Sequence, residues 1–382
     1  MKCRGCGSDG VQRVVDLGSQ TAADYFPPVS SPTEDGRWPL ELWLCSRCSL
    51  VQLGPLEPQL PEPPLAVESA TSLAHAKTSV HELLQTHPEL AGATVAEFAS
   101  HHGGSWLPSL RAAGCREAGE DERADFVVDV HGLAHEPMLR SSLARRAERL
   151  MPGGQLLLEF HHLLPLVVDC QYDTIRHGHW SYLSLAAVRE LTAPLDLHVT
   201  AARRFTLFGG SLQVMLQHGV PEGGRGPVDA SVRSVLRDEL KAGVDDAGRL
   251  ARLQAGALRS AGALHDYLTD QRSRGRTVLG YGAPSKAPVL LDVSRVGPEL
   301  LPFTVDAAVG KHGRRIPGCG VPIRPVEDLR TARPDVVLVL TWDIADEVIS
   351  QLEAGGGWGA EYVVPMPVPH VVTGGTGARS SQ

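Results

Sequence analysis

Long apolar runs are absent from this sequence, and none approaches the roughly 18 residues that a membrane-spanning helix needs. The first ten residues, MKCRGCGSDG, have no apolar core of a secretory signal. Long basic runs are absent too, and 44 acidic against 36 basic residues give a formal charge of −8. This balance argues against nucleic acid or an anionic membrane as partner. We therefore expect a cytoplasmic protein with neither partner, and a monomer.

Apolar residues are plentiful enough for folded cores. They make up 42% of the 382 residues, which excludes disorder throughout the chain. The length predicts two or three domains. The 40 glycines and 28 prolines indicate many turns, and so favour an α/β layout over a helical bundle.

Four of the seven cysteines form two close pairs, Cys3-x2-Cys6 and Cys45-x2-Cys48. In a cytosolic chain such pairs indicate metal ligands or free thiols rather than disulfides. Two pairs complete a tetrahedral shell of four thiolates, typical of structural zinc because no position stays open for catalysis. The alternative is a redox pair or unrelated thiols. The other three are isolated and are interpreted as core or surface thiols: Cys115, Cys170 and Cys319.

Composition divides the chain into four parts. Residues 1–60 are predicted to form the zinc ribbon, which ends in the Pro-rich stretch GPLEPQLPEPP. Residues 61–217 alternate apolar strands with helices, as a parallel α/β sheet does. Residues 218–371 hold a linker, a long helical stretch and a second α/β unit. Residues 372–382 are expected to be a disordered tail.

Apolar runs give the expected elements of the two α/β parts. In the middle part we expect strands at 94–99, 126–130 and 155–160. In the last part we expect one or two helices over 230–273, followed by strands at 277–280, 302–306 and 335–342.

A four-cysteine ribbon, an α/β unit and then a GYGAPSK strand-turn-helix resemble, in this order, the sugar C-methyltransferases of deoxysugar biosynthesis. The resemblance covers essentially the whole chain. It implies an N-terminal zinc ribbon, a class I methyltransferase-like parallel sheet and a C-terminal Rossmann-like nucleotide-sugar-binding domain. It also implies S-adenosylmethionine as cofactor and a dTDP-linked ketodeoxysugar as substrate, methylated beside its ketone.

The segment DTIRHGHWSYLSL at 173–185 resembles the family's catalytic segment D-T-I-Y-H-E-H-x-S-Y-x-S-L. The resemblance implies that His179 is the base that takes the proton beside the ketone. The family's tyrosine and glutamate are replaced here by Arg176 and Gly178. The catalytic candidates are therefore His179, His177 and Arg176, and the adjacent substrate-binding candidates are Ser181 and Tyr182.

The cofactor turn departs from the family pattern E-I-G-S-N-D-G. It reads Glu97-Phe98-Ala99-Ser100-His101-His102-Gly103, so alanine replaces a glycine and two histidines replace an Asn-Asp pair. In the family an acid that binds the adenosine ribose follows about 20 residues later. Here residues 108–125 leave no room for helix, strand and second helix, which predicts that the adenosine half of the pocket is deleted. The candidates for a replacement acid lie in a charged loop: Glu117, Glu120 and Asp121.

Histidines gather where the predicted strands of the middle part end. Because ligands bind at the carboxyl ends of parallel strands, we expect a site at this edge. Three interpretations of these histidines stay open. The first is a second, divalent metal site made by two or three of them with Glu159, Asp129 or Glu97. The others are a metal-free acid/base pair and an inert remnant. His135 matches a family histidine and is interpreted as structural. The cofactor-site candidates are Glu97, His101, His102, Gly103, His131 and His161.

The last part keeps the family's pattern. GYGAPSK follows a predicted strand and opens a helix whose amino end favours phosphate. At the end of the middle part, GGSLQV at 209–214 resembles the family's G-G-S-L-R-V. The candidates for the nucleotide-sugar substrate are Gly209, Gly210, Ser211, Tyr281, Gly282, Lys286, Lys311 and Arg314.

Three functions remain open at this point. The first is an enzyme of the C-methyltransferase family acting on a dTDP-linked ketodeoxysugar, with His179 as base. The second is an isomerase or epimerase that returns the proton to the enolate without a methyl donor. The third is a non-catalytic protein that binds a nucleotide sugar or a partner enzyme.

Overall fold

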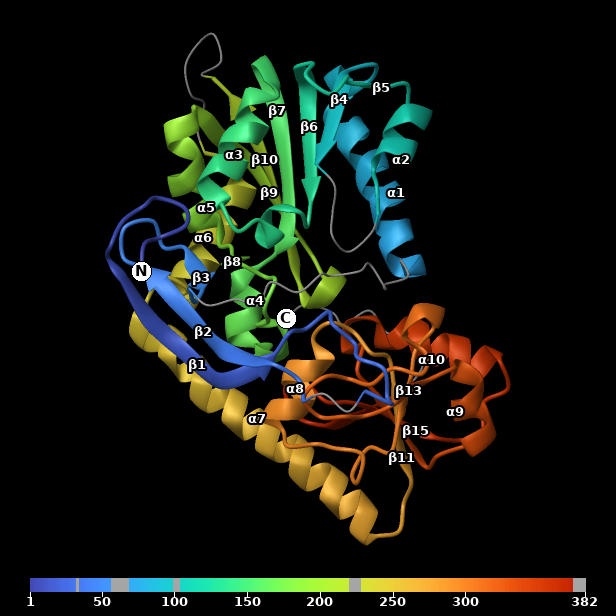
Figure 1. Cartoon of the computed structure of the whole chain (residues 1–382). Coiled ribbons are helices and arrows are strands. Elements are labelled where there is room, and N and C mark those ends of the chain that lie inside the picture. Colours follow the sequence, from blue (N-terminus) through green and yellow to red (C-terminus); the bar gives the residue numbers. More distant parts are fainter. Residues whose placement is uncertain (32–33, 56–68, 99–103, 220–227, 374–382) are drawn as a thin grey trace.

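A computed structural model describes residues 1–31, 34–55, 69–98, 104–219 and 228–373 (Figure 1). Within these ranges the strands form three sheets, of four, six and six strands. The strands of each sheet follow one another along the chain, except that the short strand Ser181–Tyr182 joins the first sheet. The expected tail at 372–382 lies almost wholly outside the described residues. No described helix combines the length and the apolar character needed to cross a membrane.

The first sheet is antiparallel and has the order β1-β2-β3-β8. Its long hairpin pairs β1 (Val11–Thr21) with β2 (Arg37–Cys45), and β3 (Val51–Leu53) follows after the second cysteine pair. The fourth strand, β8 (Ser181–Tyr182), comes from the 173–185 segment, with Val51 opposite Tyr182. The predicted boundary at residue 60 does not include this strand.

The middle sheet has the order β5-β4-β6-β7-β10-β9, and only β10 runs against the others. The strands that the sequence predicts at 94–99, 126–130 and 155–160 are observed as β4, β6 and β7, with residue 99 outside the described residues. The strands are β4 (Thr94–Phe98), β5 (Arg116–Glu117), β6 (Ala124–Val130), β7 (Leu150–His161), β9 (Leu197–Phe205) and β10 (Ser211–His218).

Helices cover both faces of the middle sheet, which is why its central strands read as continuous apolar runs. On one face α1 (Ala70–Thr86) and α2 (Leu107–Ala112) share a core with β4 and β6. On the other face the core is shared with α3 (Leu139–Glu148), α5 (Leu185–Thr192) and α6 (Ala230–Ala242).

The third sheet has the order β13-β12-β11-β14-β15-β16 and is parallel except for β16. The expected strand at 335–342 is shorter, because it ends at Val339 and Trp342 begins a 3-10 turn. The strands are β11 (Val278–Tyr281), β12 (Thr304–Val305), β13 (Ile323–Arg324), β14 (Val336–Val339), β15 (Glu361–Val364) and β16 (His370–Val372).

Four helices accompany the third sheet: α7 (Ala247–Ser273), α8 (Ala287–Val293), α9 (Val326–Ala332) and α10 (Ala345–Ala354). The stretch 230–273 thus forms two helices, one of the two outcomes that the sequence allows. The longer one, α7, runs along β1 and joins the first and third sheets in one apolar core (Figure 1).

Candidate functional site

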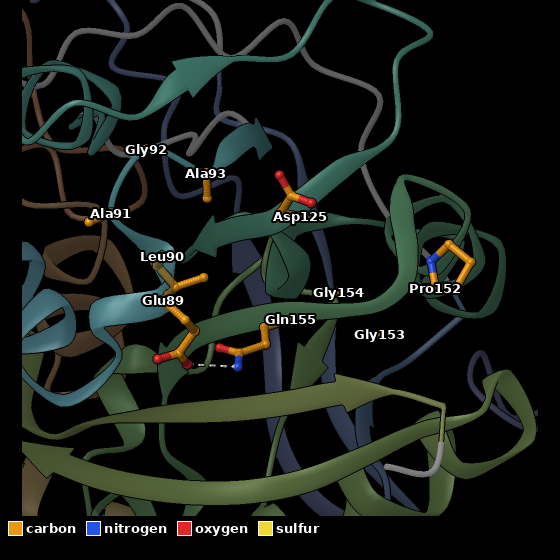
Figure 2. Close-up of a pocket in the computed structure, with 10 residues that line it drawn as sticks. All are labelled: Glu89, Leu90, Ala91, Gly92, Ala93, Asp125, Pro152, Gly153, Gly154 and Gln155. Atoms are coloured by element: carbon orange, nitrogen blue, oxygen red, sulfur yellow. Dashed lines mark hydrogen bonds between the residues drawn. The ribbon is translucent and has the colours of Figure 1, made fainter. Parts of the chain in front are cut away.

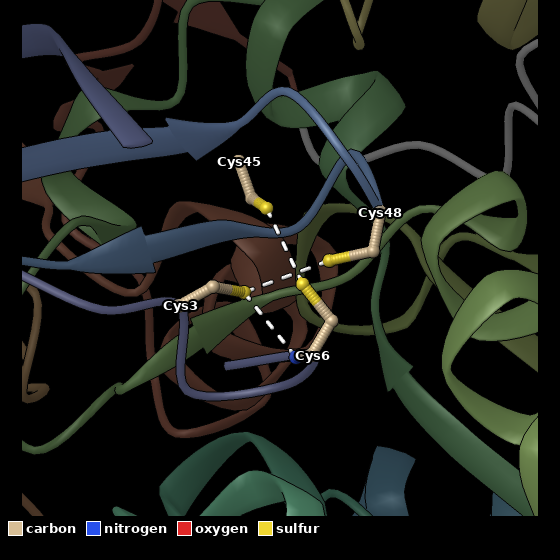
Figure 3. A group of neighbouring side chains, drawn as sticks. All are labelled: Cys3, Cys6, Cys45 and Cys48. Carbon is tan, nitrogen blue, oxygen red and sulfur yellow. Dashed lines mark hydrogen bonds between the residues drawn. The ribbon is translucent and has the colours of Figure 1, made fainter. Parts of the chain in front are cut away.

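The four paired cysteines converge at the N-terminus of the first sheet (Figure 3). Their sulfur atoms all lie within 4.8 Å of one another, with Cys3 Sγ 3.6 Å from Cys48 Sγ and Cys6 Sγ 3.6 Å from Cys45 Sγ. The Cys3–Cys48 hydrogen bond lowers the pKa of Cys3 to about 5, against the effect of burial, and raises the pKa of Cys48. Four converging thiols, one of which ionises readily, fit a structural zinc ion.

The predicted second metal site has no counterpart among the described residues. Within the described ranges, the cysteine set alone brings three or more metal-binding atoms together. Of the acids considered as ligands, Asp129 is buried in an ion pair with Arg146, and Glu97 accepts hydrogen bonds from Ser105 Oγ (2.5 Å) and Trp106 N (2.6 Å). His101, His102 and Gly103 lie outside the described residues.

The 173–185 segment contacts all three units: Asp173 bonds to Trp342 of the third unit, β8 pairs with β3 of the first, and Leu183 forms a bridge with His162 of the middle one. Arg176 pairs with Asp24 at 2.9 Å, and both ring nitrogens of His177 face backbone carbonyls, Thr21 O at 3.2 Å and Pro39 O at 3.3 Å. Both side chains are therefore turned to the first sheet. Burial lowers the pKa of His177.

His179 instead faces rings of the middle unit and of β8. Its ring is 5.0 Å from the ring of Tyr182 and 5.0 Å from the ring of His135. His135 ends the 3-10 turn η2 (Leu133–His135), directly after β6. Sequence reasoning interpreted His135 as structural, and its place beside the predicted base was missed. The family match at this histidine was the signal that pointed to it.

The edge formed by β6 and β7 holds a carboxylate among histidines. Glu159 on β7 is hydrogen-bonded to His75 Nε2 (2.9 Å) and to His131 Nε2 (3.1 Å). Burial raises the pKa of Glu159, but the hydrogen bonds and charges of these two histidines outweigh it and lower the pKa to about 2. His131, predicted for the cofactor site, is therefore placed here, whereas His75 on α1 was missed. Its helical spacing gave no signal of contact with β7.

His161 lies two residues further along β7 and is also buried. Its Nε2 atom is 3.0 Å from Gln171 Oε1, and Gln171 Nε2 donates to Gly209 O at 2.7 Å. Burial lowers the pKa of His161 to about 4, so its imidazole is neutral at physiological pH.

The adenosine side of the middle sheet is short. Residues 108–125 were predicted to be too few for a helix, a strand and a second helix, and the structure places there only the end of α2 and the two-residue strand β5, with no second helix before β6. Strand β5 pairs Arg116 with Thr94 and Glu117 with Val95, at the start of β4. Val95, the partner of Glu117, lies three residues before the end of β4, and Glu117 forms an ion pair with Arg111. Glu117 is therefore not at the carboxyl edge of the sheet, where a bound ribose is expected.

Gly209 and Gly210 form the turn before β10, with φ of +81° and +129°. A Cβ atom on Gly209 would lie 2.4 Å from Trp342 of the third unit, and one on Gly210 would lie 2.6 Å from Pro165. Gly209 thus allows close packing between the middle and third units, and Gly210 allows it within the middle unit. Ser211 Oγ donates to Leu207 O at 3.0 Å, inside the same turn.

The third-unit cations predicted for the substrate already have partners. Lys286 pairs with Asp343, and its Nζ lies 3.9 Å from the centre of the Trp342 ring. Lys311 donates to Ala283 O at 2.9 Å. The remaining predicted residues are Arg314, which donates to Gly310 O and Phe26 O, the buried Tyr281, and Gly282, which packs against Thr341.

A surface hollow lies at the opposite, amino edge of the middle sheet (Figure 2). Residues 89–93 and 152–155 line it together with Asp125, and Gln155 Nε2 donates to Glu89 Oε1 at 3.3 Å. Because ligands of such sheets bind at the carboxyl edge, this hollow is not part of the candidate site.

Comparisons with known proteins agree with the two ends of the chain. Residues 3–59 match the family described as "Putative zinc binding domain", and residues 206–367 match the C-methyltransferase C-terminal domain. The C-methyltransferase NovU of Streptomyces niveus is 28% identical over 414 aligned residues, which cover 97% of each chain.

Two solved methyltransferase structures are distantly similar to part of the chain. The magnesium protoporphyrin IX methyltransferase of Synechocystis is 12% identical, covering 40% of this chain and 90% of its own, with a TM-score of 0.30. The N-methyltransferase NodS of Bradyrhizobium japonicum is 12% identical, covering 40% and 99%, with a TM-score of 0.28.

Proposed function

The chain belongs to the C-methyltransferase family of enzymes, and from this premise we propose that it deprotonates a dTDP-linked ketodeoxysugar at the carbon beside the ketone. The proposed base is His179. The observation that carries the proposal is the position of its ring, 5.0 Å from His135 and from Tyr182, on a segment that contacts all three units. A base held this firmly meets the positional demand of proton abstraction.

The other residues of the segment are proposed to hold it in place. Arg176 and His177 are bound to Asp24 and to two carbonyls near the first sheet, so we assign them a positioning role. Ser181 and Tyr182 also hold the segment in place, because they form strand β8 and pair with β3. For the diphosphate we propose Lys286, which would exchange the carboxylate of Asp343 for the substrate's phosphate oxygens.

The fate of the enolate separates two reactions. Methyl transfer, the reaction for which the family is named, takes its methyl group from S-adenosylmethionine. Return of a proton would make the protein an isomerase or epimerase, and the short β5, with Glu117 paired to Arg111, favours this second candidate. Both reactions begin with the same deprotonation, so both need His179.

The test measures methyl transfer and solvent exchange in one experiment. The purified chain is incubated with a dTDP-linked ketodeoxysugar in deuterium oxide, with and without S-adenosylmethionine, and the sugar is analysed by mass spectrometry. We expect deuterium or a methyl group beside the ketone, and loss of both by about 10²- to 10⁴-fold in His179→Asn.

His198→Asn is the matched control, because His198 lies on β9, away from the segment, and pairs with Asp196. The control should keep wild-type rates. A wild-type protein that binds the nucleotide sugar but neither methylates it nor exchanges its hydrogen would contradict the proposal and identify a binding protein.

A further inference from the structure

The Glu159 carboxylate is the centre of a buried polar cluster built from several elements. Its oxygens contact His75 Nε2 of α1 at 2.9 Å and His131 Nε2 at 3.1 Å, and they accept from Gln213 Nε2 of β10 at 2.5 Å. The Glu159 side chain is fully buried, while those of His75 and His131 are 12% and 10% exposed. A carboxylate with three such partners stays ionised and favours positive charge on its neighbours.

The carboxylate also fixes how the two imidazoles are oriented. Because Glu159 is ionised and can only accept, both histidines carry their proton on Nε2, which leaves Nδ1 of each as the basic nitrogen. Aromatic rings hold the imidazoles from the side: Phe205 is 4.7 Å from His75, and Phe208 is 4.9 Å from His131, both nearly perpendicular. This is the arrangement of a base oriented by an acid.

The backbone at this position is held in an unusual conformation. His131 has φ of +57° and Phe208, its ring partner, has φ of +54°. Residues other than glycine are uncommon in this region, where a bulky residue such as Phe208 is strained, and strained positions concentrate at functional sites. Asp129 provides part of the enforcement, because its Oδ1 accepts from Gly132 N at 2.9 Å and from Leu133 N at 3.1 Å.

His131 lies four residues from His135, whose ring neighbours that of the proposed base. It begins the five-residue connection after β6 that His135 ends, and the His135 ring is 5.0 Å from the His179 ring. Other titratable groups near the cluster are His161 on β7 and, on α1, Glu82, which pairs with Arg203. One short connection therefore links the Glu159–His131 cluster to the His135–His179 pair at the same edge of the sheet.

We propose that His131 is a second acid–base residue of this site, with Glu159 and His75 as its positioning residues. The proposal rests on the proposed function, since it concerns the enolate that His179 forms. When His179 takes the proton, the C–H bond breaks and its electron pair forms the enolate. The His131 imidazolium then gives its Nδ1 proton to the carbon, which forms a new C–H bond and leaves neutral imidazole. His179 releases its proton to solvent and His131 regains one, so the cycle is redox-neutral.

The test uses two substitutions that the backbone at His131 tolerates. Asparagine and glycine both adopt positive φ, so His131→Asn and His131→Gly keep the turn. In the deuterium assay without S-adenosylmethionine, both variants should exchange about 10²- to 10⁴-fold more slowly than wild type. Added imidazole should restore part of the rate to His131→Gly only. A merely structural role would not produce this rescue.

Glu159→Gln tests the positioning role. We expect about tenfold slower exchange, as a fall in kcat with KM unchanged, because the variant loses the carboxylate that accepts from His131 Nε2 and orients its imidazole. Urea unfolding of each variant, with His198→Asn as control, separates a lost rate from a lost fold.

Three results distinguish the possible failures. Wild-type rates in folded His131→Asn, together with loss in His179→Asn, would overturn this inference and leave the proposed function standing. Methyl transfer with no exchange in the absence of S-adenosylmethionine would do the same. A wild-type protein that shows neither reaction would overturn both.

Discussion

At the scale of single residues, burial decides how Asp173 ionises. This residue opens the 173–185 segment, and its Oδ2 accepts from Trp342 Nε1 at 2.7 Å. Its Oδ1 has no hydrogen-bond partner in the described part of the chain. Burial raises the pKa of Asp173 from 3.8 to about 6, although the charge of Lys286 opposes the shift. The fold therefore disfavours the ionised form.

Asp173→Asn should remove a pH dependence of stability. In wild type the folded carboxyl keeps its proton to a higher pH than the unfolded one, so the free energy of unfolding falls as pH rises from about 4 to about 6 and stays level above. Asparagine does not titrate. Relative to wild type the variant should gain up to about 3 kcal/mol between pH 4 and pH 7.5, measured by urea unfolding. Parallel stability curves for the two proteins would contradict this.

Glu239 is also buried, but unlike Asp173 it has a hydrogen-bond partner for each carboxylate oxygen. It is 2.7 Å from His162 Nε2 and accepts from Leu185 N (2.6 Å) and Ala186 N (3.0 Å) at the start of α5. It thereby fixes the helix that follows the proposed catalytic segment. His162, one of the histidines at the predicted edge, serves this contact.

Glu239→Gln should destabilise the protein by about 1–3 kcal/mol, since the amide group places a donor against buried donors. The measurement is urea unfolding monitored by circular dichroism. Glu190→Gln, on the exposed side of α5, is the control and should change stability by less than about 0.5 kcal/mol. Equal effects of the two substitutions would show that the buried contacts contribute little.

At the scale of elements, the turn before β10 determines how closely two sheets approach. Gly209→Ala would place a methyl group 2.4 Å from Trp342 at φ of +81°. Gly153→Ala is matched to it, with φ of +77° and no atom within 4 Å of the added carbon. We expect Gly209→Ala to cost about 1–3 kcal/mol more than Gly153→Ala in urea unfolding, because only the first overpacks an interface. Equal costs would mean that Trp342 moves aside freely.

Elements with a strong local pattern could be predicted from the sequence, and those made by distant partners could not. The second half of strand β7 is mostly buried and apolar, and the predicted strand at 155–160 follows from that run alone. Strand β8 has two residues and exists because Val51 offers it an edge, so no local pattern marks it. Strand β5 was missed for the same reason.

The candidate site divides in the same way. The cysteine set is recognisable because each C-x2-C pair places two ligands by local geometry. The contact of His75 with Glu159 depends on how α1 packs across β7 and β10, which single-sequence spacing does not record. The predicted roles of His179, Lys286 and the other site residues remain predictions.

At the scale of the whole molecule, the first sheet belongs to two cores. Residues of β1 and β2 pack with α7 and the third sheet, whereas Cys3, Cys45 and Cys48 pack with the middle unit. Two arginine–aspartate contacts also join the first and third units, Arg37–Asp292 at 2.6 Å and Arg315–Asp35 at 2.5 Å. The zinc ribbon therefore packs against both other units and connects them.

Removal of zinc should weaken the whole assembly. A Cys45→Ser variant should lose the metal and on the order of 5 kcal/mol of stability, because binding of a structural zinc is coupled to folding. In hydrogen exchange we expect protection to fall in β1, β2, β8 and α7, but not in α10, which packs on the far face of the third sheet. Cys319→Ser, a thiol outside the cluster, is the control. Unchanged protection in β8 and α7 would mean that the ribbon is autonomous.

The late arrival of β8 has a consequence for synthesis on the ribosome. The ribbon's own three strands have been translated once residue 53 is made, but the sheet's last strand begins at residue 181. During that interval the Val51 edge of the nascent chain is open, and no strand can close it until much of the middle sheet has emerged. The ribbon thus begins folding first and finishes after β4, β6 and β7, and a stalled ribosome would release a chain with an unpaired β-edge.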